Sequence, residues 1–426
     1  NLPQKHGCTI RSIPIPILIS TTTFIQSIRV SKKIHSKSIQ DQTNVALDIT
    51  KQLLLNEKVK DKNVVFSPLS IHVVLSMIAA GAKGSIQKGM LSFLKSKSID
   101  ALNTIASNVV PLVFADGSKL GGPLLSFANG VWIDQSLSIK PAFKNVLDND
   151  YKAALKQVDF KTEPEEVRRE VNSWGEKETK GLIKSILPFG SVSSATRVIL
   201  ANALYFKGEW DKEFDASYTR VRNFHLLDNA GSVKAHFMRT KWLYQYVSEF
   251  ETFKVLKLPY KQGKDYEREF SMYIFLPNAR NGLRALIEQF CSNVKFIDSH
   301  LPDHKVPVGR FLIPKFKISC GFEASKLLQT LGFSLGGLTE MVDPPEPLHV
   351  SLIFHKAFTE VNEKGTEAAA VTATGTMCSA GKPVPPPPID FVADHPFLYL
   401  IREEATKTVM FVGQVLNPIE DSTDFK

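Results

Sequence analysis

The sequence lacks the long apolar runs of a membrane protein and has few cysteines. Its longest apolar runs cover residues 13–19 and 73–82, well short of the roughly 18 residues that a membrane-spanning helix needs. The cysteines are too few and too scattered for a disulfide framework, and no pair has the spacing of a zinc site. We therefore expect no membrane partner, no metal and no cofactor. The four cysteines are Cys8, Cys291, Cys320 and Cys378.

Motifs that carry catalysis are also missing. There is no GxSxG elbow, no GxGxxG, no GxxxxGK[ST] and no HExxH. Asp394 precedes His395, but adjacent residues of a strand point to opposite faces, so we do not expect them to orient one another as a catalytic triad requires. We predict that the protein is not an enzyme.

Residues 1–40 contain no acidic side chain. This segment supplies six positive charges of a formal net charge of +9, so the rest of the chain is near +3, which is not the footprint of a nucleic-acid-binding protein. We expect a basic, disordered N-terminal extension, with an organelle-targeting signal as the alternative. The six charges are those of Lys5, Arg11, Arg29, Lys32, Lys33 and Lys37.

Cellular location is indicated only indirectly. The sequence has no Asn-x-Ser/Thr sequon that could accept a glycan. This absence favours a cytoplasmic protein. An extracellular protein, or one sent to an organelle by the N-terminal extension, stays open as the alternative.

Helical patterns dominate the first half of the chain. Residues 43–55 place apolar side chains four apart, which is typical of an amphipathic helix. After a short strand, Ser67 is a helix cap and Pro68 fits the first turn of an almost wholly apolar helix that stops at Gly81 or Gly84. Residues 164–183 predict another helix, with Val167, Val171 and Trp174 on one face.

Strand patterns dominate the second half. They cover residues 197–210, a hairpin over 253–277, 308–319, 348–361 and a strand pair over 395–416. Helices early and strands late favour an α+β fold with large sheets. We expect one domain over residues 41–420, followed by a tail over 421–426.

Between two of these strands lies an unusual segment. From Ala368 to Gly381 fourteen consecutive residues are uncharged and, apart from Met377, small or hydroxylated, and "PVPPPP" follows after Lys382. The 38 residues after Pro388 are too few for a second domain. The segment is therefore predicted to be a long exposed loop tied at both ends to the same body, and such loops are usually functional.

Several sequence motifs resemble those of the serpin family, and their residues are similar to those of plant Z-type serpins. They are "NVVFSPLSI", "ANALYFKGEW", "LTEMV", "FHKAF", "EVNEKGTEAAA" and "DFVADHPFLYLIREEATKTVMFVGQVLNP", in order from about Gln42 to Pro418. The resemblance implies a serpin fold with three β-sheets, about nine helices and an exposed reactive loop, here about residues 363–388. It also implies a monomeric protease inhibitor, with a protease as partner.

The resemblance further implies a suicide-substrate mechanism. A protease cleaves the loop, and the acyl-enzyme is trapped when the cleaved loop inserts into the main sheet as a new strand. The family pattern places the reactive bond between Ser379 and Ala380, preceded by Met377 and Cys378; a shift of one residue would make Cys378 the bait. Related plant serpins often carry Leu-Arg at those two places. The small residues here favour an elastase-, subtilisin- or chymotrypsin-like protease, or a papain-like cysteine protease, over a trypsin-like one.

The resemblance also implies roles for two further sets of residues, the hinge and the shutter. The hinge comprises Glu363, Lys364, Gly365, Thr366, Glu367, Ala368, Ala369 and Ala370. The shutter, a polar cluster beneath the main sheet, comprises Ser67, Ser70, Asn202 and His355. From the residues alone, Ser67 is equally a helix cap and His355 a core histidine. Trp210 and Phe397 are expected to be core residues without a special role.

The loop composition fits insertion into a sheet. With a period of two, Thr366, Ala368, Ala370, Thr372 and Thr374 share one face, and all are small and uncharged. A serpin-fold binding protein that does not inhibit would typically carry bulky or charged residues on this face of the hinge, and none is present here. A plain protease substrate differs only in the relative rates of insertion and deacylation, and it stays open as an alternative.

Thr366→Arg is predicted to convert the protein from an inhibitor into a substrate. An unpaired buried arginine would stall insertion, because burying such a charge costs several kcal/mol. The measurement is the number of protein molecules consumed for each protease molecule trapped. Trapping at the wild-type stoichiometry would show that insertion does not explain this loop.

Overall fold

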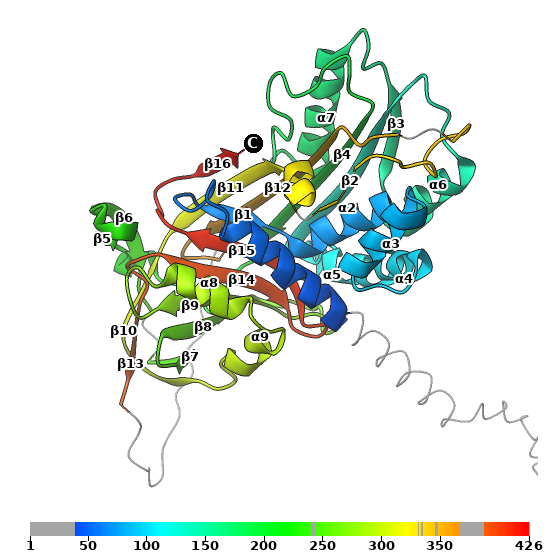
Figure 1. Ribbon diagram of the computed structural model, residues 1–426. Helices are drawn as coiled ribbons and strands as arrows, with labels where there is room; N and C mark the ends of the chain where they lie inside the picture. The colour runs from blue at the N-terminus through cyan, green and yellow to red at the C-terminus, as the bar shows by residue number, and fades with distance from the viewer. Residues whose placement is uncertain are drawn as a thin grey trace, which may run out of the picture.

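Two β-sheets form the body of the protein (Figure 1). The computed structural model describes residues 39–240, 243–330, 332–333, 335–345, 348–365 and 387–425. The first sheet has six strands in the order β16-β11-β12-β4-β2-β3. Their bounds are Ser422–Phe425 for β16, Phe316–Glu323 for β11, Leu352–Val361 for β12, Val198–Lys207 for β4, Leu124–Asp134 for β2 and Ala154–Val158 for β3.

The second sheet has ten strands. Nine follow the order β1-β15-β14-β9-β8-β7-β10-β6-β5, and β13 pairs with β10 off this path. Their bounds are Val64–Phe66 for β1, Thr408–Val415 for β15, Phe397–Glu403 for β14, Phe270–Pro277 for β9, Phe253–Pro259 for β8, Tyr244–Glu249 for β7, Val306–Pro314 for β10, Ser232–Met238 for β6, Arg220–His225 for β5 and Ile389–Val392 for β13.

The number of sheets depends on one short junction. β10 pairs with β7 at only two positions. Without these two pairs, β5, β6, β10 and β13 would be a separate sheet, which would give the three sheets that the resemblance implies. The hydrogen bonds among the described strands therefore give two sheets.

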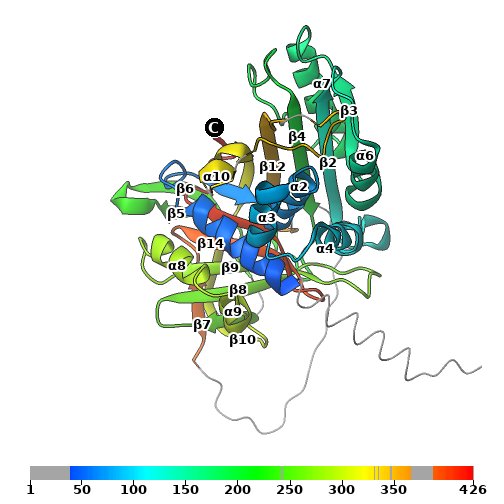
Figure 2. The same cartoon turned by 45° about the vertical axis from the view of Figure 1, so that its right-hand side comes forward.

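Most helices lie beside the first sheet in Figure 2. A helix over residues 39–54 precedes β1, so residues 39 and 40 are helical rather than part of an extension. The other helices are α2 (Pro68–Ala80), α3 (Gly84–Phe93), α4 (Ile99–Thr104), α5 (Val110–Phe114), α6 (Pro141–Val146), α7 (Pro164–Glu178), α8 (Leu283–Phe290), α9 (Lys295–His300) and α10 (Ala324–Thr330). None of the described helices is long and apolar enough to span a membrane.

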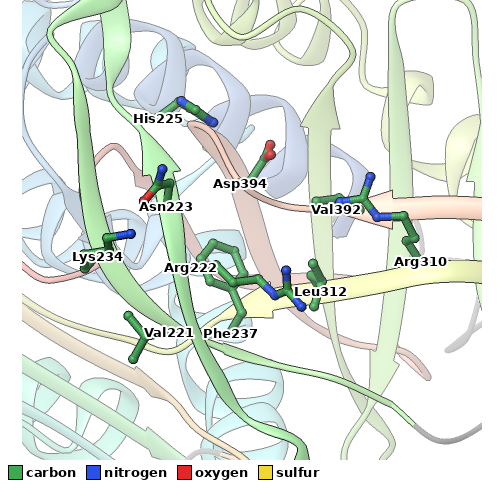
Figure 3. A pocket seen from close by; sticks show the side chains of 10 residues that line it. All are labelled: Val221, Arg222, Asn223, His225, Lys234, Phe237, Arg310, Leu312, Val392 and Asp394. Carbon is green, nitrogen blue, oxygen red and sulfur yellow. The ribbon is translucent and has the colours of Figure 1, made fainter.

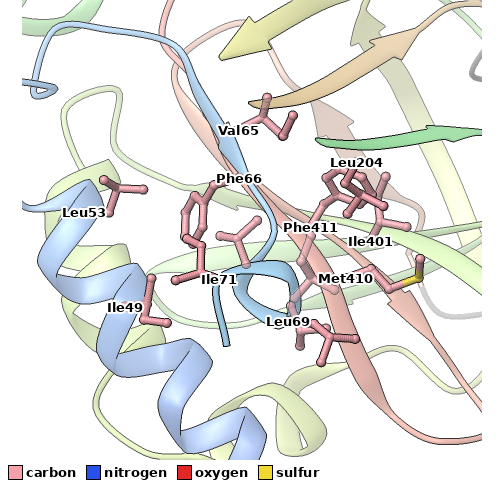
Figure 4. Close-up of a cluster of buried hydrophobic side chains, with 14 of the residues drawn as sticks. Ile49, Leu53, Val65, Phe66, Leu69, Ile71, Leu204, Ile401, Met410 and Phe411 are labelled. Carbon is pink, nitrogen blue, oxygen red and sulfur yellow. The ribbon is translucent and has the colours of Figure 1, made fainter. Parts of the chain in front are cut away.

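Helix α2 lies in the middle of the core. Ser67 caps it, since its hydroxyl oxygen accepts a hydrogen bond from the backbone N–H of Ser70 at 3.2 Å, and Pro68 is the first helical residue. Every residue from Pro68 to Ala79 is buried, as expected of a helix that is apolar on all sides. Figure 4 shows its Ile71 near Phe66 of β1 and Ile49 of the helix over residues 39–54, and its Leu69 near Met410 of β15.

Helix α7 covers the opposite face of the six-stranded sheet. The alternate β4 residues Ile199 and Ala201 belong to a second core cluster with Val171 and Trp174 of α7. Trp174 meets Trp132 of β2 edge to face, with ring centroids 5.0 Å apart. The intervening β4 residues face the α2 side, so this strand is buried on both faces.

Two details of the chain differ from the sequence prediction. The pattern over residues 308–319 is not one strand: β10 ends at Pro314 and β11 begins at Phe316, because the chain crosses there from one sheet to the other. The predicted C-terminal tail contains β16, which pairs in parallel with β11. Backbone hydrogen bonds hold this strand, and its short polar sequence gave no strand signal.

Candidate functional site

Two parallel strands lie side by side at the centre of the six-stranded sheet. β12 pairs with β4 at seven positions, from Leu352 opposite Ile199 to Phe358 opposite Tyr205. Parallel pairing is slightly weaker per residue than antiparallel pairing. β12 also leads directly into residues 362–365, the start of the predicted reactive loop.

The first residues of that loop form a tight turn. Asn362 and Gly365 pair with each other, and their backbone N–H groups donate to each other's carbonyl oxygens at 2.9 and 3.3 Å. Gly365 also forms an antiparallel bridge with Glu209, just after β4. Gly365 therefore lies beside the chain that leaves β4, at one end of the boundary between β12 and β4.

Gly365 is the residue that this geometry requires. Its φ of +136° lies in a region that residues with a side chain rarely adopt. A Cβ atom at this position would lie 2.2 Å from the backbone oxygen of Gly208. The hinge glycine thus permits close contact with the chain that leaves β4.

Glu363 ties the turn to the neighbouring chain. Its carboxylate lies 2.9 Å from Nζ of Lys315 and accepts a hydrogen bond from the hydroxyl of Thr219 at 2.7 Å. Burial alone would raise the pKa of this carboxyl, but Lys315 and Thr219 outweigh it, so the pKa lies below its usual value. Glu363 is therefore ionised at neutral pH. We call Glu363, Lys315 and Thr219 the latch.

Trp210 supports the same turn, a role that the sequence analysis did not predict. The residue is buried as predicted, and its ring stacks on Tyr260 with centroids 4.6 Å apart. In addition, its indole N–H donates to the carbonyl oxygen of Asn362 at 3.0 Å, and its backbone N–H donates to that of Lys364 at 2.9 Å. A buried tryptophan usually needs an acceptor for its N–H, and this was the available signal.

The predicted shutter residues come together beneath β4 and β12. The backbone N–H of Ser67 donates to Nε2 of His355 at 3.1 Å, and the hydroxyl of Ser70 donates to Oδ1 of Asn202. His355 Nδ1 lies 3.0 Å from the same oxygen of Asn202. Since Nε2 accepts, Nδ1 carries the proton and donates to Asn202. One side-chain hydrogen bond thus links β12 directly to β4.

Burial keeps His355 neutral. Desolvation lowers its pKa from 6.5 to about 3. A neutral imidazole has one donor and one acceptor, and both are used here. The cluster is therefore satisfied without a buried charge.

Asn129 of β2 extends this cluster and was missed by the sequence analysis. The side-chain amide of Asn202 donates to Oδ1 of Asn129 at 2.8 Å, and Asn129 in turn donates to the carbonyl oxygen of Tyr151 at 3.4 Å. Asn129 interrupts an apolar strand in "SFANGVW". A buried amide in such a strand needs partners, and this was the signal available.

Several predicted residues lie outside the described part of the chain. They are the hinge residues Thr366, Glu367, Ala368, Ala369 and Ala370 and the reactive-bond residues Met377, Cys378, Ser379 and Ala380. The site as described therefore consists of the turn, the latch, Trp210 and the polar cluster. These groups surround the boundary between β12 and β4.

The expectation for Asp394 and His395 was wrong. Nδ1 of His395 lies 2.9 Å from the Asp394 carboxylate, because the chain here is not a strand and the two side chains can meet. Nε2 of His395 lies 2.7 Å from the carbonyl oxygen of Pro277, so both ring nitrogens are occupied. Within the described residues, no three His, Cys, Asp or Glu side chains could hold a metal ion.

Comparisons with known proteins agree on one family. The family model "Serpin (serine protease inhibitor)" matches residues 40–418. Serpin-ZX of Arabidopsis thaliana is 51% identical over 90% of this chain and 99% of its own length, and Serpin-ZXA of Oryza sativa subsp. japonica is 53% identical over 84% and 91%. The solved structure of Arabidopsis AtSerpin1 in its native stressed conformation is 49% identical, with a TM-score of 0.82 over 91% of this chain and 99% of that one.

The latch is predicted to stabilise the protein by about 1 kcal/mol, because its ion pair is only partly buried. Glu363→Gln and Lys315→Met should each lower the midpoint of denaturant-induced unfolding, and the double variant should lose less than the sum. Lys156→Met is the control, since its partner Glu170 forms an exposed pair at 2.7 Å. Strictly additive losses would mean that the two latch residues do not interact.

Acid is predicted to destabilise the fold through two buried histidines. Burial lowers the pKa of His355 to about 3 and that of His72 to about 4. Below about pH 6.5 the unfolded chain binds protons that the folded chain does not, so each histidine removes about 1.4 kcal/mol of stability per pH unit until the folded pKa is reached. This contribution is fully present above pH 6.5.

The measurement is the denaturant midpoint at pH 7, 6 and 5. His72→Leu should remove roughly half of this contribution, because it removes one of the two histidines whose pKa is lowered by burial. A midpoint that does not move between pH 7 and pH 5 would contradict the assignment.

Proposed function

The chain belongs to the serpin family, whose members are mostly protease inhibitors rather than enzymes, and we propose that it inhibits serine endopeptidases as a suicide substrate. The nucleophile of the protease attacks the carbonyl carbon of Ser379, an acyl bond forms, and the amine of Ala380 leaves. The freed loop inserts between β12 and β4 and carries the protease with it. Water then fails to complete deacylation in the distorted protease.

The pairing of Gly365 is the observation that carries this proposal. Gly365 is already antiparallel to Asn362 and to Glu209. If both ladders continue in this register, residues 367–376 pair with all of β4, from Lys207 to Val198. The registers on the two sides agree: Thr372 falls opposite both His355 and Asn202, which face each other now.

Thr372 has the chemistry for that position. Insertion must break the hydrogen bond between His355 and Asn202, which would leave a buried donor and a buried acceptor without partners. A threonine hydroxyl both donates and accepts. It can therefore replace the direct hydrogen bond by two new ones.

The other loop residues suit the two faces of the sheet. In this register even-numbered residues from 366 to 376 face the α2 side and are Thr or Ala. Ala369, Val371, Ala373 and Gly375 face the α7 side, where Ala201, Ala203 and Phe354 lie. From Ala368 to Thr376 these small uncharged side chains can enter both layers without burying a charge, and Glu367 falls at the end of the ladder, opposite Lys207.

Insertion also has a driving force. It replaces one parallel ladder by two antiparallel ladders, a net gain of roughly ten hydrogen bonds worth on the order of 10 kcal/mol. The twelve residues from Ala368 to Ser379 span about 40 Å when extended. This is enough to carry the acyl-enzyme across the body.

The bait residues define the class of target. Ser379, preceded by Met377 and Cys378, favours elastase-, subtilisin- or chymotrypsin-like proteases and disfavours trypsin-like ones, which need a basic side chain. A papain-like cysteine protease is chemically equivalent up to the acyl-enzyme, with a thioester in place of the ester. If the register shifts by one residue, Cys378 becomes the bait.

The proposal is tested by incubating the protein with elastase, chymotrypsin, subtilisin, trypsin and papain. We expect a complex that survives denaturing electrophoresis at the summed mass with at least one of the non-tryptic enzymes. The mass of the released C-terminal fragment should correspond to a chain that begins at Ala380. A protease whose nucleophile is replaced by alanine is the control and should form no such complex.

The same experiment separates the alternatives. Cleavage in the loop without a denaturant-stable complex would show a plain substrate. No cleavage by any enzyme would show a serpin-fold protein that does not inhibit these proteases. Either result would overturn trapping as the function towards this panel.

A further inference from the structure

The segment that follows β15 covers one edge of the six-stranded sheet. Its strand β16 pairs with β11 in parallel over residues 319–322, and the backbone N–H of Ser319 donates to the carbonyl oxygen of Asp421 at 2.8 Å. In Figure 1, β16 lies on the outer side of β11, close to the C-terminus. Without β16, β11 would be the end strand of this sheet.

A buried asparagine turns the chain from β15 onto this edge. Oδ1 of Asn63 accepts hydrogen bonds from the backbone N–H groups of Leu416 and Asn417 at 2.7 and 3.0 Å. Its Nδ2 donates to the carbonyl oxygens of Asn417 and Glu420 at 2.6 and 3.0 Å. One side-chain amide thus fixes the turn that carries the chain from the ten-stranded sheet to the six-stranded one.

The other strands at the ends of the two described sheets are short or charged. β1 has three residues, and β3 has five, including Lys156, which pairs with Glu170 at 2.7 Å. β5 contains the exposed Arg220 and Arg222, and Figure 3 shows Arg222 at the pocket between the β5–β6 hairpin and β10. Short length and charge are the usual means by which proteins prevent a sheet edge from pairing with another molecule.

β11 has neither protection. It is eight residues long, and residues 318–322 contain no charge and no proline. One face of the strand is anchored in the core by Phe316, Ile318, Cys320 and Phe322. A long, uncharged and well-anchored strand is a template for pairing with another strand. β16 covers the uncharged part, and it replaces this edge by one of four residues that include Asp424.

We propose that the tail guards β11 against pairing with β11 of a second copy of this chain. Two identical end strands can pair antiparallel about a twofold axis, because each presents the same row of N–H and C=O groups to the other. Release of the tail would therefore turn a monomer into a dimer. β11 lies on the far side of β12 from the boundary with β4, so the proposal does not rest on protease inhibition.

The ladder decides which backbone groups hold the tail. The N–H of Ser319 donates to Asp421. A regular parallel ladder then directs the N–H groups of Thr423 and Phe425 at β11 and that of Ser422 away from it. Because proline has no N–H, Thr423→Pro removes one hydrogen bond to β11. Ser422→Pro introduces the same ring one residue earlier without that loss, and it is the matched control.

The test is the molar mass in solution, measured by sedimentation velocity over a range of protein concentrations. The full chain and Ser422→Pro should stay monomeric. A chain that stops after Glu420, and the full-length variant Thr423→Pro, should approach about twice the monomer mass as the concentration rises. A single cooperative unfolding transition in denaturant shows that each variant is folded.

A second substitution places the contact at β11. The N–H of Ser319 points to the tail and not to β12, so Ser319→Pro removes no hydrogen bond to β12. In the shortened chain, Ser319→Pro should restore the monomer. Thr366→Arg should not restore it, because this substitution acts on insertion of the reactive loop and leaves β11 unchanged.

Four results would overturn the proposal. The shortened chain could stay monomeric, or the full chain could associate as strongly as the shortened one. The shortened chain could also still associate with Ser319→Pro, which would place the contact elsewhere. Loss of association with Thr366→Arg would show that the reactive loop, and not the edge of β11, links the copies.

Discussion

The parallel pairing of β4 and β12 is the constraint on which the rest of the structure depends. Both strands are buried on two faces, so anything that enters between them must match a packed layer on each side. The link at the centre is polar, from His355 to Asn202. A polar link can be made again through an incoming hydroxyl, whereas interlocked apolar side chains would have to repack. The closed sheet is stable and still able to open.

Two different interactions hold this boundary closed. The latch at Glu363 is partly exposed to solvent, so dissolved salt screens its charges. The cluster around His355 is neutral and deeply buried, so salt does not reach it. In the proposed insertion, the end that opens first is therefore the end that responds to dissolved salt, whereas the middle opens when a strand brings groups that replace the buried hydrogen bond.

Local patterns predicted local structure well. The cap at Ser67, the all-round apolar α2 and the packed face of α7 follow from spacing and turn chemistry, and the predicted hairpin over residues 253–277 is β8 and β9. The resemblance, rather than the pattern, brought Ser67 and His355 together. The roles of Asn129 and Trp210 were missed because their partners are distant in sequence, and no local pattern shows that the chain changes sheets at Lys315. Long-range pairing decides these features, and periodicity contains no information on it.

The tight turn at residues 362–365 also acts as a tether. Because Gly365 is fixed beside Glu209, the proposed insertion of the following residues is intramolecular, with the effective concentration of a short tether, roughly millimolar. A loop from another molecule can match this only when the protein is similarly concentrated. In the proposed mechanism, this tether therefore favours self-insertion over strand exchange between molecules, and it sets the concentration above which linked copies would form.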